Sequence, residues 1–540
     1  MSNIIHKKCC IIKGKNLEGC KKLNSKKGKN YLTGAAIIAA GGLIAKFLGI
    51  FFKIPIDNII GSYGFGLYSF AYPLYSTFLS ISVIGLPVAV SKMIAERMSR
   101  GDYFNARKVF RLAFMTLAIL GAVGSLVMFF GANFFIKIFK WDVNAYYSIV
   151  ALSIAPFFVT IISAFRGYFQ GMQLMSMSSI SQIIEQIGRV AVGVFLAWYL
   201  TEQFGVVYGA AGAVFGAVVG AILAFFFLQG MYVYQNKKEK TLRENQKNIV
   251  AESTKSILKT LLIISIPITL GGMITTVMDL INSVTISDGL LKSGLDQVTV
   301  TELYGILEQK AQTLINVPLI IGSALSASLV PSISASFAKN DKLMARKKVS
   351  LAIRVAFIIG IPSSIGLSVL SEPIISLLFG TSEGGDMLGA LAYVVIFTIG
   401  MTSLQGILQG AGKFYQPLIN MAIGTIVKLV LNLWWLPNPE LGIFGAIYSS
   451  IVASAVIFLL NLYQVKKHIG FNNVWISVTK SFVAALIMGV VARFIYDLIN
   501  VSVGSSIAVL VAILVAMLVY FVIIVISKAF TREDFQAVRE

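Results

Sequence analysis

Long hydrophobic segments alternate with short polar connections along almost the whole chain. Most of these segments are about 20 residues long or longer, the length that a helix needs to cross the hydrocarbon core of a bilayer. The strands of a membrane barrel would instead alternate apolar and polar residues over short runs, and these segments do not. We therefore predict fourteen membrane-spanning helices, at residues 34–56, 66–91, 108–133, 145–169, 177–200, 206–231, 257–284, 303–334, 349–371, 386–411, 415–436, 441–464, 474–497 and 503–528.

Lysine and arginine concentrate in alternate connections between these segments. The connections after predicted spans 2, 6 and 8 are strongly basic, whereas those after spans 1, 5, 9 and 11 have no lysine or arginine in their exposed parts. Lysine and arginine are enriched in the cytoplasmic loops of membrane proteins. The pattern therefore predicts that both termini lie in the cytoplasm.

The composition supports an all-α polytopic membrane protein. Of the 540 residues, 57% are hydrophobic and 13% are charged, whereas soluble domains carry about 25% charged residues. The net charge of +21 comes from the basic connections and from residues 1–30, which hold nine lysines and one glutamate. Because membrane orientation accounts for this charge, we expect no nucleic-acid partner.

The sequence offers little for catalysis or metal binding. All three cysteines lie in residues 1–30, and their spacing with His6 fits no common zinc site. The other histidine, His468, lies in a predicted loop, and no Gly-x-x-x-x-Gly-Lys element for nucleotide binding is present. We expect neither an enzyme nor a metal site or cofactor.

An internal repeat with a constant offset of 239 residues links the two halves of the chain. Residues 101–108 match 340–347, and 166–171 match 405–410. Each copy has six predicted spans, so the two copies share one orientation and are related by an axis along the membrane normal. We divide the chain into a basic cytoplasmic tail (1–32), an N-terminal lobe (33–232), a cytoplasmic linker (233–256), a C-terminal lobe (257–465), and two further spans with a C-terminal tail (466–540).

Charged residues inside the predicted spans are the first candidates for function, since ionisable groups at membrane depth are costly and usually face an internal cavity. Lys46 and Lys53 are seven residues apart in the first span and share one helix face. Glu308 and Lys310 in the eighth span are two residues apart and point to different faces, so we do not expect them to pair with each other. All four are candidates for a substrate cavity.

Other intramembrane polar residues allow both a structural and a functional interpretation. Asp279 in the seventh span is a candidate ligand for a coupling sodium ion or proton, with Asn420 or Asn432 of the eleventh span. Lys428 lies 239 residues after Arg189, so the repeat keeps a cation at both places; a fixed role between the lobes and a substrate role are both open. Arg189 itself lies four residues after Glu185, a spacing typical of a structural ion pair.

Two stretches of the first predicted hairpin carry a family resemblance, residues 45–68 (AKFLGIFFKIPIDNIIGSYGFGLY) and 71–92 (AYPLYSTFLSISVIGLPVAVSK). They resemble the polysaccharide-transporter branch of the multidrug/oligosaccharidyl-lipid/polysaccharide exporter superfamily. Within that branch the similarity is to the stage V sporulation protein B group, whose relatives include MurJ-type lipid II flippases. The resemblance extends over predicted spans 1–12.

This resemblance implies a flippase of the bacterial cell membrane that moves an undecaprenyl-pyrophosphate-linked cell-wall precursor, lipid II, from the inner to the outer leaflet. It implies two six-helix lobes around a central cavity, opened alternately to either side. Basic residues at Lys46 and near Lys53 would meet the pyrophosphate, and Lys310 would supply the charge that relatives carry in span 8. The last two spans would form a groove for the polyprenyl tail.

The resemblance also sets expectations about energy and partners. Coupling to the membrane potential, to sodium or to protons is expected, since no nucleotide-binding element is present. The expected partners are lipid II, membrane lipids and cell-wall synthesis proteins, and the expected state is a monomer.

Two other functions compete with this interpretation. A multidrug exporter of the same superfamily, exchanging organic cations for sodium or protons, would show an acidic, aromatic cavity and typically twelve spans. A membrane-embedded glycosyltransferase would carry acidic clusters in large external loops, but the predicted external loops are short. The basic first span favours the flippase.

Overall fold

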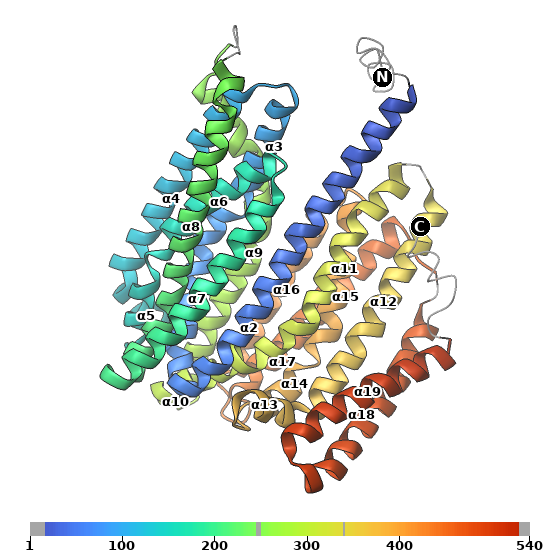
Figure 1. The fold of residues 1–540 in the computed structure, drawn as a ribbon. Helices are drawn as coiled ribbons and strands as arrows, with labels where there is room; N and C mark the ends of the chain where they lie inside the picture. Colours follow the sequence, from blue (N-terminus) through green and yellow to red (C-terminus); the bar gives the residue numbers. More distant parts are fainter. Residues whose placement is uncertain (1–16, 245–249, 339–340, 473, 529–540) are drawn as a thin grey trace.

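The computed structural model describes residues 17–244, 250–338, 341–472 and 474–528 (Figure 1). Within these ranges every regular element is a helix, as predicted. The elements are α2 (Leu17–Val83), α3 (Gly85–Ser99), α4 (Tyr103–Phe139), α5 (Ala145–Leu152), α6 (Ala155–Gly171), α7 (Met175–Phe204), α8 (Val206–Glu244), α9 (Thr254–Lys292), α10 (Gln297–Gly305), the π-helix η1 (Ile306–Ala311), α11 (Gln312–Ala338), α12 (Lys342–Val369), α13 (Ser371–Phe379), α14 (Gly385–Leu391), α15 (Val394–Gly410), α16 (Tyr415–Trp435), α17 (Phe444–His468), α18 (Trp475–Val503) and α19 (Ser505–Ile526).

The number of membrane crossings is close to the prediction without confirming it. In the described part of the chain, twelve helices are long and apolar enough to cross a membrane, and α14 with α15, bent by 41°, would add a thirteenth. The first of the twelve is the 59-residue stretch Gly41–Ser99, which at 1.5 Å per residue is about 90 Å long. A bilayer core is about 30 Å thick, so fourteen crossings require this stretch to count as two.

A break at Gly61 divides that long stretch. Gly61 has φ 64° and ψ −177° in the middle of α2, a backbone conformation that glycine adopts without a steric penalty. The helix starts at the end of the molecule that carries the N-terminus, and α3 lies at the same end (Figure 1). The chain therefore crosses the molecule and returns between Leu17 and α3.

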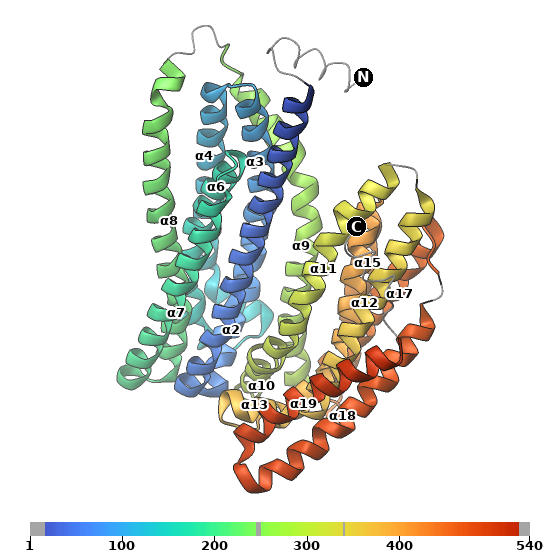
Figure 2. The same cartoon turned by 45° about the vertical axis from the view of Figure 1, so that its right-hand side comes forward.

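The two halves of the chain form two helix groups that are joined at one end. In Figure 2 the groups separate toward the end that carries the N-terminus and come together at the other end, where α10 and α13 lie. α9 packs against α2 and α3 of the first group and against α16 of the second. α18 and α19 pack against each other at the outer edge of the second group, where α18 also contacts α12.

The internal repeat appears in the way that equivalent helices begin. α4 starts after Asp102, whose carboxylate accepts a hydrogen bond from the backbone N–H of Asn105. α12 starts after Asp341, whose carboxylate accepts one from Met344. An aspartate at this position satisfies a backbone donor that the helix leaves unpaired. The two caps lie 239 residues apart, so the matching sequences adopt the same local structure.

Equivalent glycines also allow the same close helix contact in both halves. α6 and α15 each have 17 residues, and both their first and last residues differ in number by 239. A Cβ added at Gly171 would lie 2.8 Å from Cβ of Ile94, and one at Gly410 would lie 2.9 Å from Cβ of Ile333. Small residues let helix backbones approach closely in membranes.

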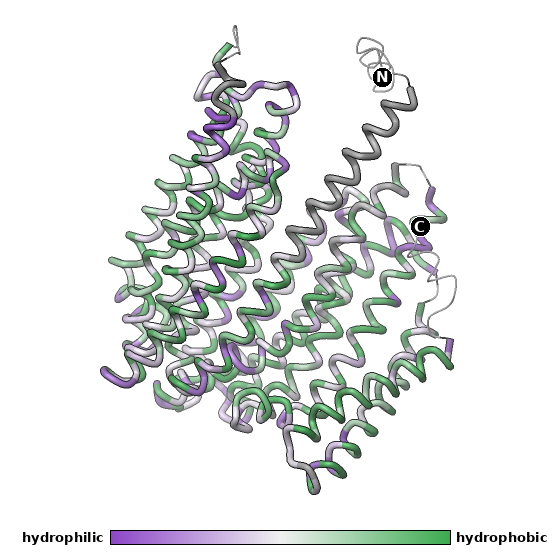
Figure 3. Tube along the Cα trace, in the orientation of Figure 1, coloured by the Kyte–Doolittle hydropathy of each residue, from purple (hydrophilic) through white to green (hydrophobic). Residues whose placement is uncertain are grey.

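Hydrophobic residues run along most of the length of the helices, and hydrophilic residues lie at many helix ends, including the connection between α3 and α4 (Figure 3).

The helices also extend into the segments that the sequence predicts to be a tail and a linker. α2 begins at Leu17, within the expected tail 1–32, and α8 continues to Glu244, within the expected linker 233–256. The boundaries of the five parts and the sidedness of the termini remain predictions.

Candidate functional site

The two lysines of α2 lie in different surroundings. Lys46 is exposed, whereas Lys53 is half-buried. The Lys53 ammonium donates a hydrogen bond of 2.6 Å to the hydroxyl of Thr313 in α11. Lys53 therefore connects the first half of the chain to the second, while the Lys46 ammonium stays accessible to a ligand.

Glu308 and Lys310 point away from each other, as their spacing predicts. They lie in η1, where the helix widens to a π-turn, an irregularity that is frequent at functional sites. The Glu308 carboxylate accepts a hydrogen bond of 3.3 Å from Asn282 of α9. The Lys310 ammonium instead lies 3.1 Å from the carboxylate of Asp57 in α2.

Lys310 and Asp57 form a buried ion pair between the two halves. Their side chains are 1% and 4% exposed. Lys310 also lies 3.6 Å from the Glu383 carboxylate and donates to the hydroxyl of Thr381 at 3.2 Å. The Ser62 hydroxyl donates to Glu383 at 2.9 Å. Lys310 is thus enclosed by protein partners in this conformation, and a substrate could reach it only after the pair separates.

Sequence reasoning missed Asp57 and Glu383. Asp57 follows the last residue of the predicted first span, 34–56, so the prediction places it outside the span. Its distance of four residues from Lys53 nevertheless puts both on one helix face. Glu383 lies between α13 and α14, and no short-range pattern in the sequence links it to Lys310.

The ion pair belongs to a tightly packed seam between the halves. A Cβ at Gly66 would lie 2.0 Å from the carbonyl oxygen of Thr301, and a Cβ at Gly305 would lie 2.4 Å from that of Ser62. The Gln309 amide donates to the Ser69 hydroxyl at 2.7 Å. Since only glycine permits backbones to approach this closely, α2 and the α10–η1 segment are packed too tightly here for a ligand to pass.

A second group of polar residues joins α9, η1 and α16. Lys428 of α16 is 9% exposed, and it interacts electrostatically with Glu308 and Asp279. Glu308 interacts in the same way with Lys428 and Lys53. Asp279 remains accessible. Asp279 interacts electrostatically with the buried Lys428 and Glu308. We therefore infer that the accessible surface of Asp279 faces the protein interior.

Asn432 extends this group along α16. Its amide donates to the Thr285 hydroxyl at 2.8 Å and to the Asn282 side-chain oxygen at 3.4 Å. The Ser449 hydroxyl donates to the Asn432 side-chain oxygen. Asn432 is therefore linked through Asn282 to the Glu308 carboxylate, and Asn282 lies one helical turn from Asp279.

Asn420 does not join this group. It lies 12 residues before Asn432 on the same helix, about 18 Å along the axis, and its amide donates to the Asn461 side-chain oxygen at 2.8 Å. Of the two asparagines considered as partners of Asp279, the structure brings only Asn432 near it. Among the described residues, no group of three or more His, Cys, Asp or Glu side chains could hold a metal ion.

The first half has its own buried ionic group. The predicted pair of Glu185 and Arg189 is present at 3.5 Å. Arg166 of α6 joins it, with its guanidinium 2.8 Å from the Glu185 carboxylate. Two cations therefore share one carboxylate inside the N-terminal half.

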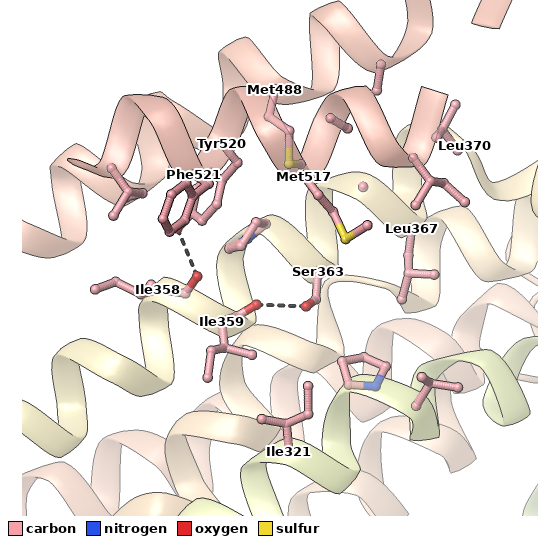
Figure 4. Close-up of a pocket in the computed structure, with 18 of the residues that line it drawn as sticks. Ile321, Ile358, Ile359, Ser363, Leu367, Leu370, Met488, Met517, Tyr520 and Phe521 are labelled. Atoms are coloured by element: carbon pink, nitrogen blue, oxygen red, sulfur yellow. Dashed lines mark hydrogen bonds between the residues drawn. The ribbon is translucent and has the colours of Figure 1, made fainter. Parts of the chain in front are cut away.

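A large apolar groove lies between α18 and α19 on one side and α11, α12 and α13 on the other (Figure 4). Its volume is about 1280 Å³. Among the described residues that line it, Lys528 is the one that carries a charge. The Tyr520 hydroxyl donates to the Ile358 carbonyl at 2.8 Å, so a polar group on the groove wall is satisfied within the protein. The apolar lining includes Ile321, Ile358, Leu367, Met488, Met517 and Phe521.

Comparisons with known proteins agree with this architecture. The polysaccharide biosynthesis protein family matches residues 31–337, more than half of the chain, and the MatE family matches residues 309–434. The chain is 24% identical to stage V sporulation protein B of Bacillus subtilis (strain 168), over 94% of this chain and 98% of that protein. It is 27% identical to lipid II flippase MurJ of the same organism, over 82% and 83%.

A solved structure shares the fold at lower sequence identity. The lipid II flippase MurJ in an inward closed conformation superposes with a TM-score of 0.68 at 16% identity, over 90% of this chain and 98% of that chain. Long apolar helices, two repeated halves and two further helices at the C-terminal end are thus the features of a multi-pass membrane transporter. This chain belongs to the polysaccharide biosynthesis protein family and has the fold of the multidrug/oligosaccharidyl-lipid/polysaccharide exporter superfamily.

Proposed function

We propose that this protein is a flippase for a lipid-linked oligosaccharide, with the undecaprenyl-pyrophosphate-linked precursor lipid II as its substrate. The observation that carries the proposal is a large apolar groove on the same molecule as two lysines, Lys46 and Lys53, in the hydrophobic part of α2. A lipid with a charged head and a very long tail needs both. The names of the relatives stage V sporulation protein B and lipid II flippase MurJ support this substrate class.

The head group would be held by the lysines of α2. Lysine binds phosphate as a point charge, and Lys46 is accessible while Lys53 is held by Thr313 at the boundary between the halves. The tail would lie in the groove beside α19. Burial of each CH₂ group from water contributes about 0.8 kcal/mol, but a tail that stays in lipid needs only an apolar path, which the groove provides.

The contacts between the two halves would allow the substrate site to open to one side of the membrane at a time. The Asp57–Lys310 pair and the Gly66 and Gly305 contacts close the end where the halves meet, while the halves separate toward the end that carries the N-terminus (Figure 2). With the N-terminus in the cytoplasm, a substrate would enter from the inner leaflet. Separation of the seam would then release it to the outer leaflet.

Export of organic cations is the alternative, supported by the MatE match over residues 309–434. Both functions can be tested in the same proteoliposomes, with fluorescent lipid II in one set and a fluorescent organic cation in another. We expect protein-dependent transfer of lipid II between leaflets and no uptake of the cation. Cation uptake without lipid II transfer, by protein shown to be folded, would refute the flippase.

A further inference from the structure

Lys428 is the buried cation that the mechanism above does not use. It is 9% exposed in the middle of α16, and within the described ranges it makes no hydrogen bond and no ion pair within 4.0 Å. A buried ammonium without a close partner is costly unless opposite charge lies nearby. Its presence therefore calls for a compensating negative charge.

That charge comes from two carboxylates on neighbouring elements. Lys428 lies one helical turn before Asn432, whose amide donates to the Asn282 side-chain oxygen at 3.4 Å. Asn282 in turn donates to the Glu308 carboxylate of η1 at 3.3 Å and lies one turn from Asp279 on α9. Asp279 and Glu308 are therefore the acidic groups near Lys428, and both interact with it electrostatically.

Lys53 of α2 interacts electrostatically with Glu308, and the buried Tyr304 of α10 interacts electrostatically with both carboxylates. α17 packs against α16 at this level and contributes the neutral Ser449. The group therefore holds two carboxylates and two ammonium groups, and its formal charge is zero.

Because the formal charges of this group cancel, the group does not attract a further cation. Two carboxylates with nearby amide and hydroxyl oxygens would suit a small hard cation if they were uncompensated. With an ammonium group already beside them, an added sodium ion would be repelled at short range in a medium of low dielectric constant. The oxygen donors are present here, but the charge that would attract a metal ion is already neutralised.

The repeat adds an independent observation. Arg189 occupies the equivalent position in the first half, 239 residues earlier, and it pairs with Glu185 at 3.5 Å. Both halves thus carry a side-chain cation at this place, each with acidic partners on its own side of the molecule. A cation built into the chain is a common feature of the two copies.

We propose that the Lys428 ammonium is the resident counter-ion of Asp279 and Glu308, in the place that a sodium ion would otherwise take. The polar group of the C-terminal half then binds no sodium, and its conformational change is independent of sodium. This inference deepens the proposed function, because it removes sodium from the ions that could drive the transport.

Thermal unfolding of the purified protein in sodium, potassium or choline chloride at equal ionic strength tests this without any substrate. We expect the native chain to have the same melting temperature in all three salts, and Lys428→Gln to gain several degrees in sodium alone. Lys428→Arg, which keeps the charge, is the matched control and should stay insensitive. Saturable stabilisation of the native chain by millimolar sodium would overturn the proposal, as would a Lys428→Gln variant that folds and shows no response to sodium.

If Lys428→Gln does not fold, the double variant Lys428→Gln with Asp279→Asn tests whether Lys428 is the counter-ion. A resident counter-ion predicts that this variant, which loses one charge of each sign, folds while the single variant does not. Failure of both would contradict the assignment. Because no lipid is present, the result stands apart from any failure of the flippase proposal.

Discussion

At the scale of single residues, the Asp57–Lys310 pair is the feature with the largest expected effect on stability. Both side chains are almost fully buried, and removing one member of a buried pair typically costs about 3–5 kcal/mol. Without Asp57, Lys310 would keep only the more distant and exposed Glu383, at 3.6 Å. We expect Asp57→Asn to lower the free energy of unfolding by about 3 kcal/mol, measured by denaturant titration in detergent.

The control for this variant replaces both charges by apolar groups. Asp57→Leu with Lys310→Met removes the unpaired charge and should recover most of the lost stability, since buried pairs often contribute little net stability. Glu383 lies 3.6 Å from Lys310 and would remain as a single acid near the surface. An Asp57→Asn variant as stable as the native chain would show that the pair is not formed in the resting protein.

Residue spacing predicted the directions of some of these side chains but not their partners. Two residues of separation put Glu308 and Lys310 on different faces, and they do contact different elements. The partner of Lys310 could not be predicted, because the pairing depends on how closely two distant helices pack at Gly66 and Gly305. That packing is a tertiary property, and a single sequence does not reveal it.

At the scale of the elements, the groove between α19 and the second helix group should select for the substrate tail. Met517 lines the groove, whereas Leu514, on the same helix and similarly exposed, does not. Met517→Asn places an amide on the apolar path, and we expect about a tenfold loss in the transport rate of a long-chain polyprenyl substrate.

This prediction is tested by how the loss in transport rate depends on the length of the substrate's tail. A substrate analogue with a short tail does not reach far into the groove, so Met517→Asn should transport it at close to the native rate. Leu514→Asn serves as the control, since it adds the same polar group to the same helix. Equal losses for Met517→Asn and Leu514→Asn, or equal losses with both tails, would assign the effect to helix insertion rather than to the groove.

Periodicity and repeats predicted most of the elements. The offset of 239 residues anticipated equivalent helices, and α6 and α15 reproduce it at both ends. The count of crossings could not be confirmed by length alone, because Gly61 breaks one long apolar stretch without a polar loop. The groove was expected from the family resemblance, and hydropathy alone could not have located it, since its walls come from helices far apart in the sequence.

At the scale of the whole molecule, the sequence predicted two like-oriented halves but not their relative position. The repeat and the spacing of the spans define the halves, and the charge of the connections predicts which end faces the cytoplasm. Which end is closed depends on a few contacts at the seam between α2 and η1. A transporter has more than one such arrangement, so no single arrangement follows from the sequence.

Leaflet-resolved transfer of labelled lipid II in proteoliposomes, with the native chain beside Lys46→Gln/Lys53→Gln, is the most direct test of the proposed function. The control is Lys466→Gln/Lys467→Gln, which removes the same charge from two exposed lysines at the end of α17.

We predict transfer by the native chain and by the control, and a loss of at least about tenfold in the Lys46 and Lys53 variant, as expected when one charge-assisted contact to a phosphate is lost. A native chain that is folded and moves no lipid II would contradict the proposed function. Full transfer by the Lys46 and Lys53 variant would contradict the role of α2 in holding the pyrophosphate.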